Sequence, residues 1–557
     1  MTQLKPSYSS GETLDERVVL NQPKAANTGE LAGESQTAYD RVPYPNYVHS
    51  QTHPNRLAAI AALFGMKAAP VDRCRILELG CGQGANLIPI ANAFPETGCV
   101  GIDLSSLQIG QGNEVVDAVG LSNIELKALS ILDLPEDLGE FDYIICHGVY
   151  SWVPAEVRDK ILAICKQHLS PNGVAIISYN TFPGWHQRRM IRDMMGFHTK
   201  AFEEPKKRVE QARAFLTLMT KAIPAESAYG KSLHEEFRAL SGADDSYLFH
   251  EQLEDINEPQ YFHQFAASLE QHGLQYLNEV NLNNLSLDGY PPEVAKVLAD
   301  MPLTEREQYV DFLVRRTFRQ SIICRDDVVL DRTKLNQNID DLFLACPAVT
   351  NPESGPIDLT PGTQVSFVGL RQTKITVNDP TCKAALGLLA KAWPQPIKFT
   401  DLDVASRKAV AGNGIVLSNR DSMQQDSARL AQHMLRSLIA GAVSVQVATN
   451  TFTVAVADRP TACPLARAQT QFGNRVATRL FQTTNLNPLN QFLVGQLDGN
   501  RTHDQLLDLL VGFVEESEFV MQHQGQPVTE TQAIRELIGQ QLKPNLEILA
   551  RKGLLVK

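Results

Sequence analysis

The sequence predicts an α/β fold, with a parallel, doubly wound sheet within its first 325 residues. Three observations support this prediction. Apolar runs of strand length alternate with helical periodicity from Arg75 onward. The first of these runs leads straight into a glycine-rich turn. Polar and aromatic side chains follow the later runs, where the carboxyl ends of parallel strands would form one edge of the sheet, so we expect a ligand there.

The first predicted strand, Arg75–Leu79, ends in a turn that contains Gly80, Gly82 and Gly84. Glycines allow the backbone to turn sharply and to approach a ligand without a Cβ in the way. A dinucleotide fingerprint would be spaced G-x-G-x-x-G, whereas the spacing here is G-x-G-x-G and Glu78 precedes it. A carboxylate at this place would repel a pyrophosphate and suits an ammonium, directly or through water.

The second predicted strand, Gly98–Ser105, contains Asp103, 19 residues beyond Gly84. A carboxylate there can accept hydrogen bonds from both hydroxyls of a ribose. A ribose and an amino-acid end without a phosphate indicate S-adenosylmethionine (AdoMet). A glycine-rich turn alone would also fit a Rossmann-like domain that binds another nucleotide or nothing, but the acid, the spacing and Asp103 together favour AdoMet.

Three further strands follow, and each leads to polar or aromatic residues. The third, Ile124–Leu129, precedes Asp133 and Asp137, and the fourth, Phe141–Cys146, precedes His147 and its neighbours. His147 either orients a substrate or closes a loop. The fifth strand, residues 173–179, ends in a segment with Asn180 and Trp185.

Between Tyr179 and the sixth-strand candidate, Leu274–Val280, lie 94 residues, far more than one crossover helix requires. The sequence therefore predicts a helical insertion at about 185–272, whose amphipathic helices form a substrate platform, a dimer surface or extra core. A seventh strand at Phe318–Cys324 would close the domain, which we place at 38–325.

Two smaller modules are predicted beyond residue 325. A hairpin pattern at 363–377, three helical stretches, and alternation at 442–447 and 451–456 predict a winged-helix-like middle domain at 326–458. Residues 459–557 read as a mainly helical domain whose last helical pattern is Leu546–Val556. Residues 461–557 contain nine Lys and Arg and nine Asp and Glu, so no basic charge supports DNA binding and we favour a protein contact.

Composition narrows the function classes. Apolar residues make up 43% and charged residues 20%, and no apolar run approaches the length of a membrane span. Residues 1–37 are polar, lack the core of a signal peptide and are predicted to be a mobile tail, so we expect a cytoplasmic protein without membrane insertion. The net charge of −12 disfavours nucleic-acid binding and is compatible with a basic polypeptide substrate.

The nine cysteines are scattered, without a C-x-x-C pair or histidines at zinc spacing. We expect reduced core cysteines and no metal site. Cys81, inside the glycine-rich turn, is interpreted as a small space-filling residue and not as a nucleophile.

The segment 39–56, before the first helix, is dense in tyrosine, proline and histidine and includes Tyr44. Its prolines predict an extended conformation. It either covers one edge of the sheet or lies over the methyl donor, and the two interpretations are compatible.

The stretch Glu78–Gly84 resembles the first motif of the class I, seven-stranded AdoMet-dependent methyltransferases, an acid followed by x-G-x-G-x-G. The resemblance implies a Rossmann-like sheet, AdoMet as cofactor and S-adenosylhomocysteine (AdoHcy) as product. In that pattern an acid after the third strand contacts the adenine amine, which favours Asp133 over Asp137. The predicted cofactor-binding residues are Glu78, Gly80, Cys81, Gly82, Gly84, Asn86, Asp103, Leu104, Asp133 and His147.

Three blocks, at 39–56, 147–152 and 247–263, resemble bacterial methyltransferases that carry a methyltransferase regulatory domain. That family includes the rickettsial protein-lysine methyltransferases of outer membrane protein B. The resemblance implies a homodimeric protein-lysine methyltransferase with a dimerisation insertion, a middle domain and a C-terminal domain. The identity of the protein substrate does not transfer.

Lysine methylation requires a neutral amine, and burial lowers the pKa of a lysine. Holding the amine near the methyl group contributes about 7 to 11 kcal/mol of effective concentration, so no strong base is obligatory. We therefore predict positioning residues, each of which has packing as its alternative: Tyr44, His147, Tyr150, Tyr179, Asn180 and Trp185. Methylation of a small molecule or another side chain, and AdoMet sensing without catalysis, are the alternative functions.

Overall fold

The computed structural model describes residues 41–42, 47–347, 349–350, 356–369, 374–415, 420–517, 522–523 and 526–556. The predicted tail at 1–37 and the candidate Tyr44 lie outside these ranges. The chain divides into two compact units. The larger unit comprises residues 46–183 and 256–557, and the smaller comprises the residues up to 45 together with 184–255.

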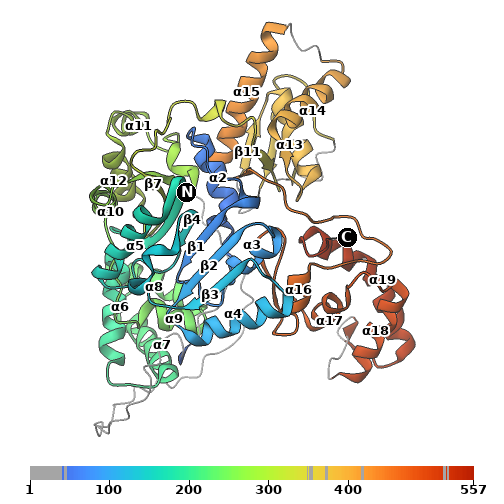
Figure 1. The fold of residues 1–557 in the computed structure, drawn as a ribbon, viewed down its shortest axis with the longest axis horizontal. Helices are drawn as coiled ribbons and strands as arrows, with labels where there is room; N and C mark the ends of the chain where they lie inside the picture. Colours follow the sequence, from blue (N-terminus) through green and yellow to red (C-terminus); the bar gives the residue numbers. More distant parts are fainter. Residues whose placement is uncertain are drawn as a thin grey trace. The chain divides into compact units, whose positions relative to one another are not determined.

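The larger unit contains a seven-stranded sheet with the strand order β3-β2-β1-β4-β5-β7-β6 (Figure 1). Its strands are β1 (Arg75–Leu79), β2 (Gly98–Asp103), β3 (Ile124–Ala128), β4 (Phe141–Cys146), β5 (Leu169–Asn180), β6 (Leu274–Glu279) and β7 (Phe318–Arg325). Strands β1 to β5 pair in parallel, whereas β7 runs antiparallel to both β5 and β6. The predicted class I methyltransferase sheet is confirmed, with its sixth and seventh strands in the expected places.

Helices cover both faces of this sheet, as a doubly wound fold requires. Side chains of β1 alternate between two hydrophobic clusters, since Ile76 belongs to one and Leu77 to the other. The first cluster includes α2 (Pro54–Leu63), α3 (Leu87–Ala93) and α4 (Ser106–Val119), and the second includes α5 (Ala155–His168) and α10 (Phe262–Gln271). The carboxyl ends of the parallel strands are thereby left for binding.

The smaller unit has a core of its own. Its helices are α6 (Trp185–Thr199), α7 (Pro205–Ala222), α8 (Ala228–Ser241) and α9 (Asp245–Gln252). Ile191, Leu216 and Leu233 are among the side chains buried between these helices. The insertion is therefore helical, as predicted, whereas α10, at its predicted end, packs on the sheet.

The middle module combines two small sheets with three helices. Its elements are β8 (Phe343–Ala345), β9 (Val349–Thr350), β10 (Val365–Val368), β11 (Lys374–Val377), α13 (Pro380–Ala392), β12 (Ile397–Lys398), α14 (Phe399–Gly412), α15 (Arg420–Ile439) and β13 (Ser444–Gln446). The predicted hairpin at 363–377 is confirmed, because β10 pairs antiparallel with β11. The two stretches of alternation do not form a pair of strands, because β13 pairs with β8 and the described segment 451–456 contains no strand. Instead, Thr453 N donates to the carbonyl oxygen of Leu555.

The C-terminal module adds two short hairpins to its helices. Its elements are α16 (Pro464–Gln469), β14 (Arg475–Ala477), β15 (Thr483–Asn485), α17 (Pro488–Gln496), α18 (His503–Glu516), β16 (Gln522–His523), β17 (Gln526–Pro527) and α19 (Thr531–Arg551). The predicted last helix therefore ends at Arg551, and Leu555 forms a β-bridge with Ala462.

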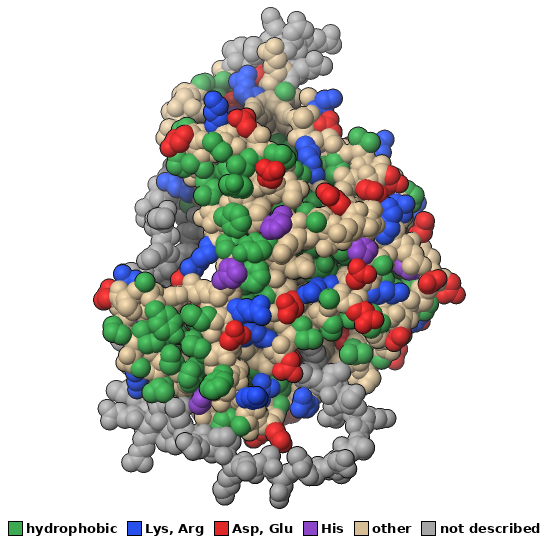
Figure 2. Space-filling model, turned by 90° about the vertical axis from the view of Figure 1, so that its left-hand side faces the viewer, with side chains coloured by type: hydrophobic (Ala, Val, Ile, Leu, Met, Phe, Trp, Pro, Cys, Tyr) green, Lys and Arg blue, Asp and Glu red, His purple; other side chains and the backbone are tan. Residues whose placement is uncertain are grey.

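Apolar side chains reach the surface in patches that lie among charged and polar ones (Figure 2). Phe197 on α6 is 85% exposed, and Val329, after β7, is 89% exposed. Within the described ranges, none of the helices combines the length and the apolar character that a membrane span requires.

A buried ionic cluster holds the antiparallel edge of the sheet. Arg319 of β7 is almost fully buried, and its guanidinium contacts Glu279 of β6 at 2.7 Å and Asp311 at 2.8 Å. It also lies 3.2 Å from a carboxylate oxygen of Glu307, and Arg316 pairs with Asp311. Burial raises the pKa of Glu307, although the charge of Arg319 and the hydrogen bond from Asn284 act in the opposite direction.

We predict that Arg319→Met destabilises the protein by about 3 to 5 kcal/mol, because it leaves buried carboxylates without their cation. Denaturant unfolding followed by tryptophan fluorescence measures this loss. Lys127→Met is the matched control, since it removes an exposed ion pair with Glu125 and should cost less than about 1 kcal/mol. Equal losses in the two variants would show that the cluster does not hold the sheet edge.

Candidate functional site

The glycine-rich turn continues β1 and is bonded to β2. Gly80 N and Cys81 N both donate to the carbonyl oxygen of Ile102, at 2.8 and 3.0 Å. Gly80 has a φ of +76°, and a Cβ placed there would lie 2.4 Å from a methyl carbon of Val149. Both the backbone conformation and the neighbouring loop after β4 therefore require glycine at this position.

Asp103, at the end of β2, is hydrogen-bonded to the turn. Its Oδ2 accepts from Gly82 N at 2.8 Å, and its Oδ1 accepts from Ser105 N at 2.9 Å. Because a carboxylate has about four acceptor positions, these backbone bonds are compatible with the binding of ribose hydroxyls as well. The Ser105 hydroxyl also caps α4, so the start of this helix and the carboxylate are held together.

Glu78 is a buried carboxylate within this arrangement. It is 5% exposed, and its Oε1 accepts from Asn86 Nδ2 at 3.2 Å. Within the described part of the chain, its Oε2 has no hydrogen-bond partner. Burial raises the pKa of Glu78 to about 8, although the Asn86 hydrogen bond acts in the opposite direction. A buried carboxylate with one unpartnered oxygen fits a ligand that brings an ammonium group.

Cys81 is also buried, and burial raises the pKa of its thiol, which therefore stays protonated. A Cβ at Gly101 would lie 2.8 Å from the Cys81 sulfur. The thiol fills the space beside β2, in keeping with the interpretation of Cys81 as a space-filling residue.

Residues Tyr47–His53, which we name the N-terminal strap, meet the turn at Asn86. His49 N donates to Asn86 Oδ1 at 3.1 Å, and Asn86 Nδ2 donates to Thr52 Oγ1 at 2.8 Å. The strap includes the short 3-10 helix η1 (Ser50–Thr52). This part of the predicted extended segment thus lies directly against the residues around Glu78.

His147 follows β4 and contacts both β5 and the strap. Its Nδ1 lies 2.7 Å from Ser178 Oγ, which also accepts from Gly148 N at 2.8 Å. The ring of His49 meets the His147 ring edge-on, with 4.3 Å between centroids. Burial, with a smaller contribution from His49, lowers the pKa of His147 to about 3, so its imidazole is neutral at pH 7.

The other predicted positioning residues are largely buried. Tyr150 and Tyr179 lie in the hydrophobic cluster beneath α5 and α10, with their rings 6.1 Å apart and both against Phe265. Asn180 Nδ2 donates to Asn257 Oδ1 at 3.1 Å. Trp185 is buried at the start of α6, in the smaller unit. All four side chains are thus held within the protein interior, and their substrate roles stay predictions.

Two acids and two leucines lie after β2 and β3. Asp133 ends the short helix η3 (Ile131–Asp133) and is exposed, as is Asp137. Leu104, directly after β2, is 66% exposed, and Leu132 is 39% exposed. Exposed leucines beside the carboxyl ends of strands suit the flat face of an adenine.

Sequence reasoning missed Thr52, Leu132 and Ser178. Leu132 stands next to Asp133, a predicted site residue, but the neighbouring leucines and Ile131 give it no distinguishing signal in the sequence. Thr52 and Ser178 act through hydrogen bonds to residues 34 and 31 positions away, for which the sequence carries no local signal.

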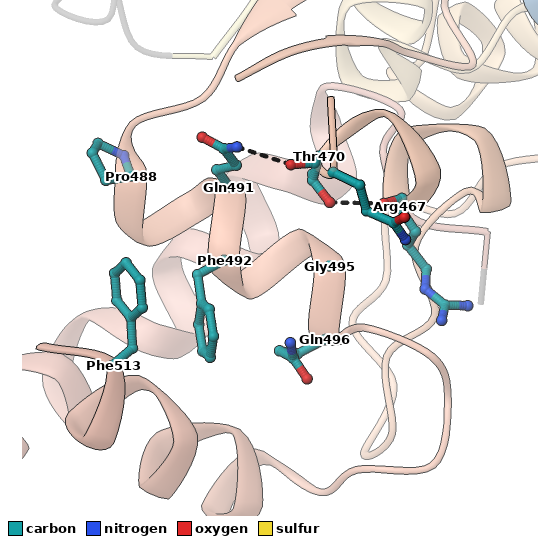
Figure 3. Close-up of a pocket in the computed structure, with 9 residues that line it drawn as sticks. Arg467, Thr470, Pro488, Gln491, Phe492, Gly495, Gln496 and Phe513 are labelled. Atoms are coloured by element: carbon teal, nitrogen blue, oxygen red, sulfur yellow. Dashed lines mark hydrogen bonds between the residues drawn. The ribbon is translucent and has the colours of Figure 1, made fainter. Parts of the chain in front are cut away.

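Two surface cavities lie elsewhere. One, of about 410 Å³ in the C-terminal module, has the stacked rings of Phe492 and Phe513 on one side (Figure 3). The other, of about 430 Å³, adjoins Lys67 and Asp327. The residues that line these two cavities do not include the glycine-rich turn. The candidate site is therefore inferred from the hydrogen-bond donors and acceptors around that turn and not from a cavity. The described residues contain no cluster of His, Cys, Asp and Glu able to hold a metal.

Three protein families match the chain. "Methyltransferase domain" matches residues 76–173, and "Predicted methyltransferase regulatory domain" matches 244–325. "PKMT, C-terminal winged helix domain" matches 458–554. The winged-helix match thus falls on the module that we predicted to be mainly helical, where hairpins accompany the helices.

Two relatives match over almost their full length. An uncharacterized protein of Rickettsia prowazekii is 32% identical over 99% of this chain and all of its own length. PKMT2 from Rickettsia typhi is 30% identical and covers 92% of this chain and 100% of its own, with a TM-score of 0.82. The chain belongs to the PKMT family.

The structure of PKMT2 in complex with AdoHcy has a TM-score of 0.81 to this chain. The present chain is therefore an AdoMet-dependent methyltransferase, and its cofactor is AdoMet. The residues around the glycine-rich turn fit that cofactor, because the unpartnered Oε2 of Glu78 suits its ammonium and Asp103 suits its ribose.

We predict that AdoHcy binding at pH 7 releases a proton from Glu78. In the free protein its pKa of about 8 keeps the carboxyl mostly protonated, and a neighbouring ammonium favours the charged form. The amino group of AdoHcy is already mostly protonated at pH 7. AdoHcy affinity should therefore rise as the pH increases from 6 towards about 8.

Calorimetry in two buffers with different ionisation enthalpies measures the released proton. Glu78→Gln should abolish the release, whereas Glu136→Gln, at an exposed carboxyl, should leave it unchanged. The same proton release in wild type and Glu78→Gln would contradict the assignment of the ammonium to Glu78.

Proposed function

We propose that this chain transfers methyl groups from AdoMet to lysine side chains of a protein substrate. The observation that carries the proposal is the likeness to PKMT2, which extends through the insertion and the C-terminal modules as well as the methyltransferase sheet. A methyltransferase for small molecules needs only the sheet and a cover. Methylation of another side chain or of a small molecule, and AdoMet sensing without transfer, are the alternatives.

For the cofactor we propose the following roles. Glu78 binds the ammonium, and Asp103 accepts hydrogen bonds from the ribose hydroxyls. Asp133 accepts from the adenine amine, with Leu104 and Leu132 against the faces of the adenine. Gly80, Gly82 and Gly84 let the backbone approach the cofactor, while Cys81 fills the space behind them. When bound, AdoMet supplies a methyl group activated on its sulfonium.

On the acceptor side, the residues orient a neutral amine and keep water out. His147, with its pKa of about 3, is neutral at pH 7 and acts as a hydrogen-bond partner, not as a base. Burial also raises the pKa of Tyr150 and Tyr179, so both keep their hydroxyl protons. We propose that these three residues, with Asn180, shape the channel in which a lysine is desolvated and loses its proton. For Tyr44, outside the described residues, and for Trp185, in the smaller unit, a role with the acceptor stays a prediction.

The test incubates the purified protein with methyl-labelled AdoMet and host-cell extract, and locates the label by gel electrophoresis and peptide mass spectrometry. We expect label on lysines of discrete proteins. Asp103→Ala should weaken AdoHcy binding at least about tenfold and reduce labelling, because charged hydrogen bonds contribute about 1.5 to 3 kcal/mol each. Glu136→Ala is the matched control and should behave like wild type.

Other outcomes separate the alternatives. Label found only in small molecules, or on side chains other than lysine, would show that lysine is not the methyl acceptor. AdoHcy binding without any transfer would favour a sensor. Unchanged AdoHcy affinity in Asp103→Ala would remove the ribose assignment, and normal turnover in His147→Ala would give His147 a packing role.

We also propose that the enzyme is a cytoplasmic homodimer that pairs through the insertion. All nine cysteines are free and buried, which suits a reducing compartment. Phe197 on α6 is 85% exposed, and Tyr229 of α8 and Leu218 of α7 are each 38% exposed. Exposed apolar side chains on one helical unit are typical of a surface that is covered by another copy.

We predict that Phe197→Glu shifts the protein from dimer to monomer, because it places a charge in an apolar interface. Light scattering during size-exclusion chromatography at micromolar concentration measures the mass. Val329→Glu places the same charge at an equally exposed position outside the insertion and should leave the dimer intact. A dimer that survives Phe197→Glu would exclude this helix from the interface.

A further inference from the structure

The N-terminal strap, Tyr47–His53, lies between the methyl-donor site and the C-terminal winged-helix domain. On one side it bonds to Asn86, and on the other it meets the β14–β15 hairpin, whose two strands are joined by residues 478–482. All of these residues belong to the larger unit. The strap therefore connects two parts of the chain that are about 400 residues apart in sequence.

At the donor site, the strap decides which way the Asn86 amide points. His49 N donates to Asn86 Oδ1, so the oxygen faces the strap and Nδ2 faces Glu78 Oε1 and Thr52 Oγ1. A flipped amide would lose the hydrogen bond from His49 N, because it would place its NH₂ group against that N–H donor. Thr52 Oγ1 donates in turn to the carbonyl oxygen of His49 at 2.9 Å, which closes the turn of the strap.

At the other side, three contacts tie the strap to the hairpin. Val48 N donates to Thr483 Oγ1 at 2.9 Å, across 435 residues of sequence. The guanidinium of Arg475 lies over the Tyr47 ring at 4.7 Å. The rings of His53 and Phe481 are 3.7 Å apart.

Phe481 is held in an unusual conformation at this contact. Its φ is +52°, a left-handed region that a bulky residue rarely adopts, and its side chain is 5% exposed. The same ring stacks with Phe94, at the end of α3, at 6.4 Å. A phenylalanine keeps a left-handed backbone conformation only where the surrounding structure imposes it. Here the aromatic partners of Phe481 are His53 of the strap and Phe94 at the end of α3.

Further hydrogen bonds attach the C-terminal domain to α3, directly behind the glycine-rich turn. Arg479 Nη1 donates to the carbonyl oxygen of Asn92 at 3.2 Å, and Asn92 Nδ2 lies 3.3 Å from the Cys463 sulfur. The hairpin is thus anchored to the same helix that follows Asn86. It holds the strap from a fixed position relative to the turn.

We propose that Thr483 and Phe481 of the C-terminal domain are positioning residues for the methyl-donor site, which act through the strap on Asn86 and Glu78. Thr483 fixes the backbone of the strap at Val48, next to His49, whose N–H orients the Asn86 amide. The proposal rests on the function proposed above in one respect, namely that Glu78 binds the ammonium of the cofactor. It makes the C-terminal winged-helix domain a part of the cofactor site, beyond any role in substrate contact.

The test uses the full chain and AdoHcy binding by calorimetry. Thr483→Val, which removes one hydrogen bond to the strap, should weaken AdoHcy binding about 3- to 10-fold. Thr483→Ser keeps the hydroxyl and should restore wild-type affinity. Thr484→Val is the matched control, because the hydroxyl of this neighbouring residue accepts from Lys552 Nζ at 3.4 Å and, among the described residues, has no hydrogen bond to the strap.

Turnover distinguishes positioning from general damage to the fold. Thr483→Val should raise the KM for AdoMet by the same factor and leave kcat within about twofold, as expected when ground-state binding alone is lost. The combination with Thr52→Val should be less than additive, because both changes act through Asn86. Fully additive effects, or equal affinities for Thr483→Val and Thr484→Val, would overturn the proposal.

Hydrogen exchange followed by mass spectrometry gives a second readout in the unaltered protein. AdoHcy should slow exchange in the strap and in residues 475–485, and leave α18 unchanged. Protection that stops at the strap would also overturn the proposal. Because AdoHcy carries no methyl group to transfer, these results do not depend on whether lysine is the acceptor, so failure of the lysine assay and failure of this proposal are distinguishable.

Discussion

The hydrogen bond from Asn86 to the buried Glu78 carboxylate is the central interaction of the proposed methyl-donor site. Glu78 lies one residue before the end of β1, just ahead of the glycine-rich turn. Among the described residues its carboxylate has one amide donor and no cation as a partner. Burying a carboxylate in this way is unfavourable until a cation arrives. The buried carboxylate is therefore more stable with a cationic ligand than without one. Around it, Asp103 is hydrogen-bonded to the glycine-rich turn, and the strap is hydrogen-bonded to Asn86.

Much of the methyltransferase sheet could be predicted from sequence because its signals are local. A buried strand, a glycine turn and an acid at Asp103 lie within 30 residues, and each strand shows its apolar run directly. Even the antiparallel β7 and the displaced β6 could be located by their apolar patterns after the insertion. What those runs do not encode is the polar group that joins the two strands, since Arg319 and Glu279 are 40 residues apart.

The remaining parts depend on partners far away in sequence. The alternation at 442–447 and 451–456 has the period of β-strands. However, β13 pairs with β8, about a hundred residues earlier, and in the segment 451–456 Thr453 N donates to the carbonyl oxygen of Leu555. Tyr150 follows β4 and Tyr179 lies near the end of β5, and the sequence does not indicate that both rings pack beside Phe265, which comes more than 80 residues later. Periodicity indicates which residues form a strand, and it carries no information on which neighbour that strand selects.

The hydrogen bond between Val48 and Thr483 also bears on how the protein is made. Synthesis proceeds from the N-terminus, so the whole sheet leaves the ribosome well before the β14–β15 hairpin does. Until then the strap lacks its hydrogen bond at Val48, so we expect a nascent or truncated chain that ends before residue 483 to bind the methyl donor more weakly. Full affinity for AdoMet would then be reached only near the end of translation.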